Sequence, residues 1–239
     1  MTPATTARPT PNDRPMRLAV RAFLSLAAYT VAMALLLFVP AGTVRYWQGW
    51  VYLAIVVGAA LVTMLDLLAR DPALLERRMV GGPMAEKRPA QKVIMVVASA
   101  AFIAMVVVPA LDRRFGWSHV PLGIVIVGDL LVLLGFAFVF FVYRANTYTS
   151  ATIEVAENQT VISTGPYGLV RHPMYASVTL YVLGTSLALG SWWGLLAGVL
   201  MIPVLVWRLF DEERMLAAQL PGYTAYQQRV RRRLVPFVW

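Results

Sequence analysis

The sequence predicts an all-α, polytopic integral membrane protein, and three observations lead to that fold class. Of the 239 residues, 59% are hydrophobic and only 14% are charged, which is far from the composition of soluble globular proteins. Four mainly apolar stretches of about 20 residues follow one another, and each is long enough to cross a bilayer as a helix. Two shorter apolar stretches then complete a pattern of four membrane-spanning helices and a C-terminal transmembrane helical hairpin.

The elements of this fold follow in order along the chain. Residues 1–15 are rich in Thr, Pro and Arg and predict a disordered cytoplasmic tail. Residues 16–143 form a four-helix membrane region, with spans at 18–40, 47–69, 93–111 and 120–143. Asp71 followed by Pro72 is a helix-start pattern, so we expect a short surface helix over 71–78. Residues 144–239 hold the hairpin and a cytoplasmic tail.

The hairpin has arms at 175–189 and 192–210, and only Gly190 and Ser191 connect them, so the arms pack side by side. The first arm reaches about 22 Å, against roughly 30 Å for the hydrocarbon core, which leaves open whether it crosses completely. Gly194 and Gly198 are spaced for a close helix contact. That contact serves either the chain itself or a second copy, so the oligomeric state stays open.

Basic residues orient the chain in the membrane. With a cytoplasmic N-terminus, Arg45, Arg113 and Arg114 fall on the outer side, and the other 18 of the 21 Lys and Arg residues fall on the inner side. This bias predicts a multi-pass protein of the cytoplasmic or inner membrane, with N- and C-termini in the cytoplasm. Topology therefore explains the net charge of +9, and no nucleic-acid partner is needed.

Composition also excludes several kinds of chemistry. Cysteine is absent, which rules out disulfides, thiolate metal ligands and cysteine nucleophiles. With only His119 and His172, a metal site built by the protein is not expected. No phosphate-binding glycine motif of the soluble nucleotide folds occurs.

Two polar clusters flank the hairpin, and its geometry returns both to the same membrane face. The first covers residues 164–175, and the second covers 211–216, followed by 222–226 and 229–239. Tyrosines, carboxylates, a histidine and arginines therefore meet at the lipid–water boundary. This arrangement predicts a cytoplasmic cofactor pocket that a lipid-borne substrate can also reach.

Each of these residues also has a plain structural interpretation. His172 before Pro173 can be a helix start whose ring faces headgroups, although His titrates near neutral pH. Glu212 and Glu213 can be a solvated pair at a membrane exit, but acids are unfavourable at a helix C-terminus, so we expect the helix to continue or the acids to bind a cation. Interfacial tyrosines usually form an aromatic belt.

Taken together, the C-terminal motifs resemble the isoprenylcysteine carboxyl methyltransferase family. The resemblance covers residues 146–239 well and the N-terminal half only weakly. It is carried by Gly165, Tyr167, Arg171-His172-Pro173-Met174-Tyr175, Glu212-Glu213-Arg214-Met215-Leu216, Gly222, Tyr223, Tyr226 and Pro236-Phe237. Where relatives often have glycine two residues after the motif tyrosine, this chain has Ser177.

The resemblance implies a membrane-embedded S-adenosylmethionine-dependent methyltransferase, with an O-methyltransferase favoured, and makes residues 144–239 its catalytic region. The acceptor would be lipophilic, most simply the carboxylate of an isoprenylcysteine-like substrate. The cofactor would be bound by Gly165, Tyr167, His172, Pro173, Tyr175, Glu212, Tyr223 and Tyr226, and the catalytic residues would be Arg171, Glu213 and Arg229. The partners are then the bilayer and the acceptor, with no metal.

Two other functions fit the same sequence. One is a membrane NADPH-dependent reductase of the sterol-reductase type, which has a similar hairpin, and the other is a non-catalytic lipid-binding protein. Whether the acceptor atom is oxygen, nitrogen or sulfur stays open. Asp66 and Asp129 lie inside apolar stretches, where an acid is a candidate functional residue or a helix–helix contact.

Overall fold

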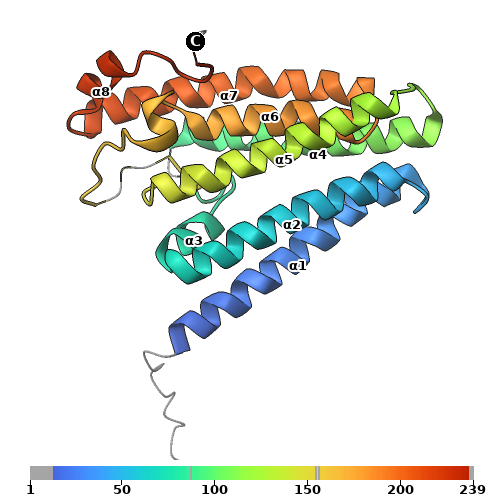
Figure 1. Cartoon of the computed structure of the whole chain (residues 1–239), viewed down its shortest axis with the longest axis horizontal. Coiled ribbons are helices and arrows are strands. Elements are labelled where there is room, and N and C mark those ends of the chain that lie inside the picture. The colour runs from blue at the N-terminus through green and yellow to red at the C-terminus, as the bar shows by residue number, and fades with distance from the viewer. Residues whose placement is uncertain (1–12, 87, 154, 156, 237–239) are drawn as a thin grey trace, which may run out of the picture.

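This computed structural model describes residues 13–86, 88–153, 155 and 157–236. Within these residues the chain forms eight α-helices and one 3₁₀ turn, joined by loops, and no strand. Figure 1 shows the long helices side by side, with α3 and α8 at the same end of the bundle. The helices are α1 (Asp13–Ala41), α2 (Trp47–Arg70), α3 (Pro72–Met79), α4 (Pro89–Phe115), α5 (Leu122–Ala145), α6 (Pro173–Ala188), α7 (Trp192–Gln219) and α8 (Tyr223–Arg229), with the 3₁₀ turn η1 (Gly165–Gly168) before α6.

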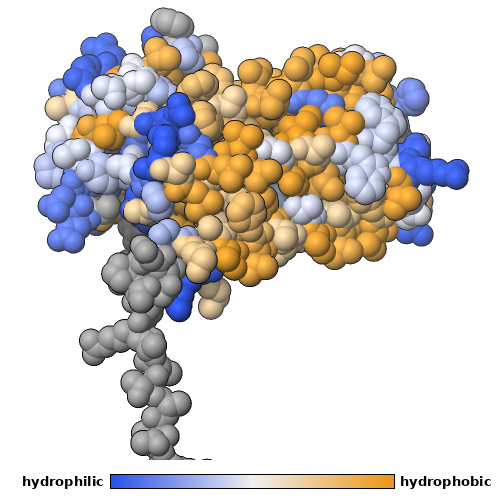
Figure 2. Space-filling model, turned by 60° about the horizontal axis from the view of Figure 1, so that its bottom comes forward, coloured by the Kyte–Doolittle hydropathy of each residue, from blue (hydrophilic) through white to orange (hydrophobic). Residues whose placement is uncertain are grey.

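Five helices, α1, α2, α4, α5 and α7, are long and apolar enough to cross a membrane. Figure 2 shows hydrophobic side chains along the length of the bundle and hydrophilic ones gathered toward its two ends. The fold class predicted from the sequence is therefore confirmed. The shorter hairpin arm, α6, has 16 residues and a length of about 24 Å.

The helix ends follow the predicted signals. The Asp71 side chain accepts a hydrogen bond from Leu74 N, 2.9 Å away, and caps α3, with Pro72 in the first turn. The last long helix continues well past residue 210, to Gln219, because Asp211, Glu213 and Met215 still find buried positions there. The two glutamates therefore lie within a helix rather than at its end.

Glycines allow the central helices to approach closely. A Cβ atom at Gly128 of α5 would lie 2.6 Å from the Leu187 carbonyl carbon of α6, and one at Gly184 of α6 would lie 2.8 Å from Gly128 O. On α7, Gly194 packs against Pro109 of α4, and Gly198 packs against Val182 of α6. The predicted glycine pair of the second hairpin arm thus serves contacts inside the chain.

The two acids in the apolar stretches lie in different surroundings. Asp66 pairs with Arg70 one turn further along α2 and with Arg144 of α5, whose nitrogen lies 2.8 Å away. It therefore makes a contact between α2 and α5. Asp129 Oδ1 is buried on α5, and no hydrogen-bond partner for it occurs among the described residues.

Residues 1–12 of the predicted N-terminal tail lie outside the described residues, and α1 begins at Asp13. Phe237, part of the C-terminal motif, also lies outside them.

Candidate active site

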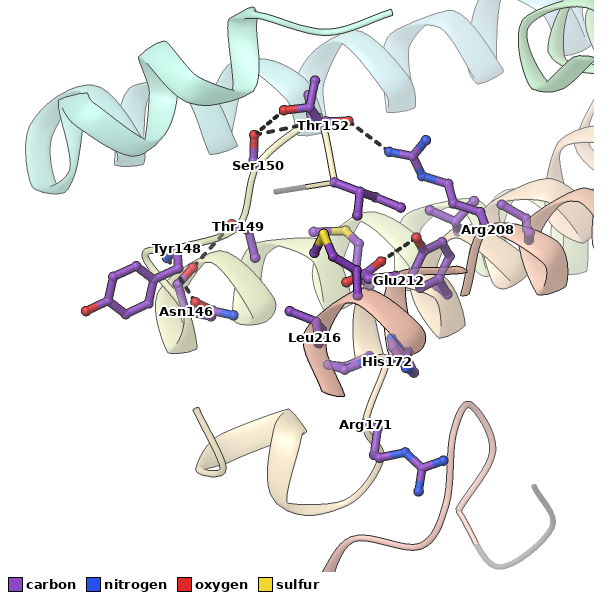
Figure 3. Close-up of a pocket in the computed structure, with 18 of the residues that line it drawn as sticks. Asn146, Tyr148, Thr149, Ser150, Thr152, Arg171, His172, Arg208, Glu212 and Leu216 are labelled. Atoms are coloured by element: carbon purple, nitrogen blue, oxygen red, sulfur yellow. Dashed lines mark hydrogen bonds between the residues drawn. The ribbon is translucent and has the colours of Figure 1, made fainter. Parts of the chain in front are cut away.

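A pocket of about 620 Å³ lies at the end of the bundle that carries α3 and α8. Helices α4, α6 and α7 form one part of its wall, and η1, α8, Arg78 of α3 and the described residues of the segment 146–162 add to it. Figure 3 shows side chains from the two polar clusters and from this segment around one space. The hairpin therefore brings the clusters together as the sequence predicted.

The first polar cluster begins with a turn that Gly165 makes possible, since its φ of +56° is a conformation that favours glycine. Within the turn, the Tyr167 hydroxyl accepts a hydrogen bond from Asn146 Nδ2 (3.0 Å), and Tyr167 O accepts one from the Tyr226 hydroxyl (2.8 Å). Burial raises the pKa of Tyr226 to about 12, so this hydroxyl stays protonated at neutral pH and keeps donating. The turn is thereby fixed to α8.

His172 precedes α6 with a non-helical backbone (φ −123°, ψ 64°), and Pro173 occupies the first turn, so the pair forms the helix start expected from the sequence. The backbone of this stretch is tied to the C-terminal segment, because Arg171 N donates to Arg232 O (2.8 Å) and His172 N donates to Arg233 O (2.9 Å). Both side chains are buried. Their positions therefore depend on residues about 60 positions later in the chain.

The two glutamates of the second cluster face different surroundings. The Tyr175 hydroxyl donates to Glu212 Oε2 at 2.6 Å, and both residues line the pocket. Glu213 is not among the residues that line it; its carboxylate accepts from Arg171 Nε (2.8 Å) and Arg233 Nε (3.1 Å). Glu213 Oε1 also lies 3.1 Å from His172 Nε2. This buried acid therefore joins α7 to the start of α6 and to the C-terminal segment.

The two arginines that were predicted to be catalytic, Arg171 and Arg229, also differ in whether they line the pocket. Arg171 lines the pocket, but its guanidinium also donates to the carbonyl of Val230 (3.1 Å), so it points toward the C-terminal segment. Arg229 is exposed on α8 and does not line the pocket. Of the predicted cofactor residues, Gly165 shapes the turn and does not itself line the pocket. The others do line it: Tyr167, His172, Pro173, Tyr175, Glu212, Tyr223 and Tyr226.

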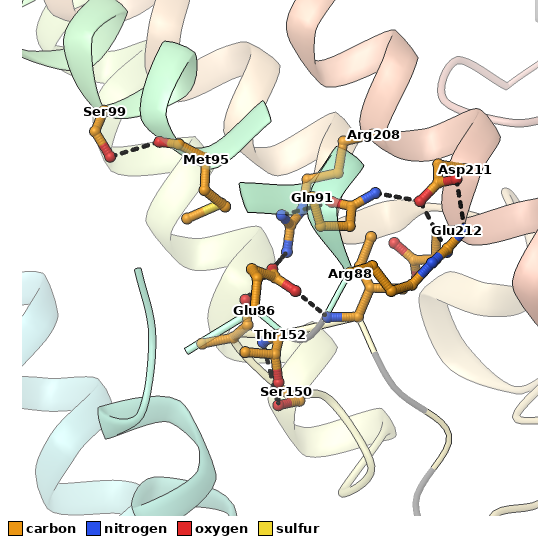
Figure 4. A network of polar contacts seen from close by, with 12 residues as sticks. Glu86, Arg88, Gln91, Met95, Ser99, Ser150, Thr152, Arg208, Asp211 and Glu212 are labelled. Atoms are coloured by element: carbon orange, nitrogen blue, oxygen red, sulfur yellow. Dashed lines mark hydrogen bonds and ion pairs between the residues drawn. The ribbon is translucent and has the colours of Figure 1, made fainter. Parts of the chain in front are cut away.

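Sequence reasoning missed the importance of Arg208, although it is the only charged residue between the two polar clusters. Arg208 lines the pocket and donates to Glu86 (2.9 Å), to Gln91 (3.0 Å) and to Ala151 O (3.1 Å). Figure 4 shows this network extending through Gln91 to Asp211. An isolated charge in an apolar arm was the signal that could have identified it.

The segment 146–162 was the other omission. It lines much of the pocket and is held by side chains on both of its edges. On one edge Arg77 and Arg78 of α3 donate to the carbonyls of Thr147 and Ser150, and on the other Arg208 donates to that of Ala151. Every residue has a backbone carbonyl, so the amino-acid types of the segment could not predict these hydrogen bonds.

The pocket combines two chemical environments. Its outer part holds tyrosine rings, Glu212 and His172, and its inner part is apolar and lies between α4, α6 and α7. Ile103 lines the inner part and is 46% exposed on the side of the bundle, so the pocket reaches the lipid-facing surface there. A polar ligand and an apolar one can therefore meet inside it.

Comparison with known proteins agrees with this arrangement. Residues 124–221 match the family model PEMT, described as phospholipid methyltransferase, which covers α5, α6 and α7. The resemblance to membrane methyltransferases is confirmed over this stretch. The cobalt-zinc-cadmium resistance protein CzcN of Cupriavidus metallidurans is 32% identical over 108 residues, which is 43% of this chain and 48% of that protein. The chain thus spans about half the length of this relative.

Proposed function

We propose that this protein is a membrane-embedded methyltransferase that moves a methyl group from S-adenosylmethionine to a lipophilic acceptor. The observation that carries the proposal is the continuity of one pocket, from tyrosines and Glu212 at its polar end to an apolar space between three helices. The helices that form it lie largely in the stretch that matches a methyltransferase family. A site with both environments suits a polar donor and an acceptor that arrives from the bilayer.

The residues of the polar part fit S-adenosylmethionine. The Tyr223 hydroxyl is buried in the pocket wall and has no hydrogen-bond partner among the described residues, so a ligand atom would satisfy it. The rings of Tyr167, Tyr223 and Tyr226 offer faces to a sulfonium cation, each contributing about 0.5–2 kcal/mol. Glu212 would accept hydrogen bonds from the amino group or the ribose hydroxyls.

The reaction needs alignment more than it needs a protein nucleophile. S-adenosylmethionine supplies a methyl group on a sulfonium, which leaves as a neutral thioether when a lone pair of the acceptor forms the new bond to carbon. The walls of α4, α6 and α7 would hold the acceptor in line and keep water away. We favour the carboxylate of an isoprenylcysteine-like acceptor, since its attack neutralises both charges and requires no base. Arg208, at the junction of the two environments, is suited to orient such an anion.

Arg171 and Glu213 then act chiefly as positioning residues. Their buried ion pair holds His172 and the C-terminal segment against α7. Glu213 would serve as a base only if it left this ion pair. A role for Arg229 near the acceptor stays a prediction, since its side chain is exposed on α8.

The experiment is calorimetric titration of the detergent-purified protein with S-adenosylmethionine and, separately, with NADPH. We expect micromolar binding of S-adenosylmethionine that weakens about fivefold in Tyr223→Phe, since one hydrogen bond contributes about 1 kcal/mol, and more in Glu212→Gln. Glu76→Gln is the matched control, because Glu76 is exposed on α3 and does not line the pocket.

The other outcomes separate the alternatives. Binding of NADPH alone would replace the proposal with a reductase. Binding of neither ligand by folded protein would support a non-catalytic lipid-binding role. If S-adenosylmethionine binds equally to all variants, its site lies elsewhere. Once binding is established, transfer of labelled methyl to candidate carboxylate, amine and phenol acceptors identifies the acceptor atom.

A further inference from the structure

The apolar part of the pocket has a regular construction. Three helices each line it over a stretch of eight residues, about two helical turns. These stretches run from Met95 to Phe102 on α4, where Ile103 also lines the pocket, from Tyr175 to Val182 on α6, and from Arg208 back to Met201 on α7. At 1.5 Å per residue, the apolar arm is about 10 Å deep on all three sides. Its polar end begins at Tyr175 and Arg208.

The inner end of this arm is closed on the α6 and α7 sides, while Ile103, beside Phe102 on α4, faces the lipid-facing surface. Val182 and Met201, which line the pocket, pack with Met105 in one buried cluster, and Met105 is 0% exposed and does not line the pocket. Phe102 packs against the same cluster, and its ring stacks on the ring of Tyr181, with the two centroids 6.4 Å apart. The Tyr181 hydroxyl is held in place by a hydrogen bond of 2.7 Å with the Tyr52 hydroxyl on α2. The floor of the arm is thus fixed from behind by side chains of other helices.

We propose that this floor, formed by Phe102, Val182 and Met201, measures the chain of the acceptor, and that the acceptor is a single-chain amphiphile. A depth of about 10 Å holds about eight carbons of one extended chain, because carbon–carbon bonds of about 1.5 Å advance a zigzag chain by about 1.25 Å per carbon. The space lies within three mutually packed helices, so it suits one chain rather than two. The inference rests on the proposed function for the acceptor's role, but the chain-binding arm can be tested without any reaction.

The test measures displacement of radiolabelled octanoate from the protein in lipid nanodiscs by unbranched alkanoates, from butanoate to tetradecanoate. We expect affinity to rise about fourfold with each methylene until the chain reaches the floor, and then to stop rising. Met201→Ala removes the side-chain atoms beyond Cβ and leaves a cavity that deepens the arm, so the plateau should move to chains about two carbons longer. Ala98→Leu fills the arm, so it should move the plateau to shorter chains. Each alkanoate partitions into the nanodisc bilayer to the same extent whichever variant is present, so partition does not affect the difference in plateau between variants.

Val97→Leu is the matched control, because Val97 neighbours Ala98 on α4 but is 43% exposed on the lipid-facing side. It should leave the plateau unchanged. An affinity that keeps rising past eight or so carbons, equally in every variant, would mean that the chain leaves the arm beside Ile103, and would overturn the proposal. If the Met201→Ala protein is unstable, the Ala98→Leu shift decides alone. Titration with S-adenosylmethionine in the same samples tests the methyltransferase proposal separately, since the variants lie away from the tyrosine-rich part.

Discussion

At the scale of single residues, neighbouring side chains on one helix have different tasks. Glu212 and Glu213 follow each other on α7, so their side chains leave the helix about 100° apart. Glu212 therefore faces the pocket, and Glu213 faces Arg171, Arg233 and the C-terminal segment. An adjacent pair of acids in the sequence becomes one ligand-facing group and one structural group.

We expect Glu213→Gln to destabilise the fold. The Glu213 and Arg171 side chains are 7% and 6% exposed, so the amide would leave a buried guanidinium without its counter-charge. Breaking such a pair costs about 3–5 kcal/mol. The free energy of unfolding, measured by SDS titration in mixed micelles, should fall by that amount.

The matched control is Glu76→Gln, which removes an exposed pair with Arg21 whose nitrogen–oxygen distance is 3.7 Å. Exposed pairs contribute about 0–1 kcal/mol, so this variant should unfold almost like the unchanged protein. Equal stability of the two variants would show that the Glu213 cluster does not hold the C-terminal segment.

At the scale of elements, close crossing of α5 and α6 sets the position of the motif at the start of α6. We expect Gly128→Ala to cost about 1–3 kcal/mol, because the added methyl group would overlap the backbone at Leu187. Gly123→Ala, on the same helix, has open space around it and should be neutral or slightly stabilising. Thermal unfolding of both variants in detergent tests this contrast, and equal melting temperatures would contradict it.

How far the sequence predicts these elements depends on the physics behind each one. Hydropathy located the first four membrane helices to within a few residues, and Asp71 with Pro72 located α3, because both signals are local. It placed the end of α7 too early, since the helix continues past the apolar stretch to Gln219. The approach of Gly128 to Gly184 was not predicted, since it depends on which helices become neighbours.

The same limit applies to the candidate site. Motif spacing placed the tyrosines, His172 and Glu212 around one pocket, because the tight hairpin fixes the return of the chain. It could not tell that Glu213 faces an ion-pair cluster, or that the segment 146–162 covers the pocket. Those features arise from contacts between residues far apart in the chain, such as Arg78 with Ser150.

At the scale of the whole molecule, the pocket and most basic residues share one end of the bundle, and the positive-inside rule predicts that this end faces the cytoplasm. The absence of cysteine makes a direct test possible, since one introduced thiol is the only reactive group. Met84, between α3 and α4 at the pocket end, is 93% exposed, and Val44, between α1 and α2 at the other end, is 66% exposed. In intact cells, a membrane-impermeant maleimide should label Val44→Cys and leave Met84→Cys unlabelled until the cells are opened. The reverse pattern would invert the topology and place the pocket outside, where a cytoplasmic supply of S-adenosylmethionine could not reach it.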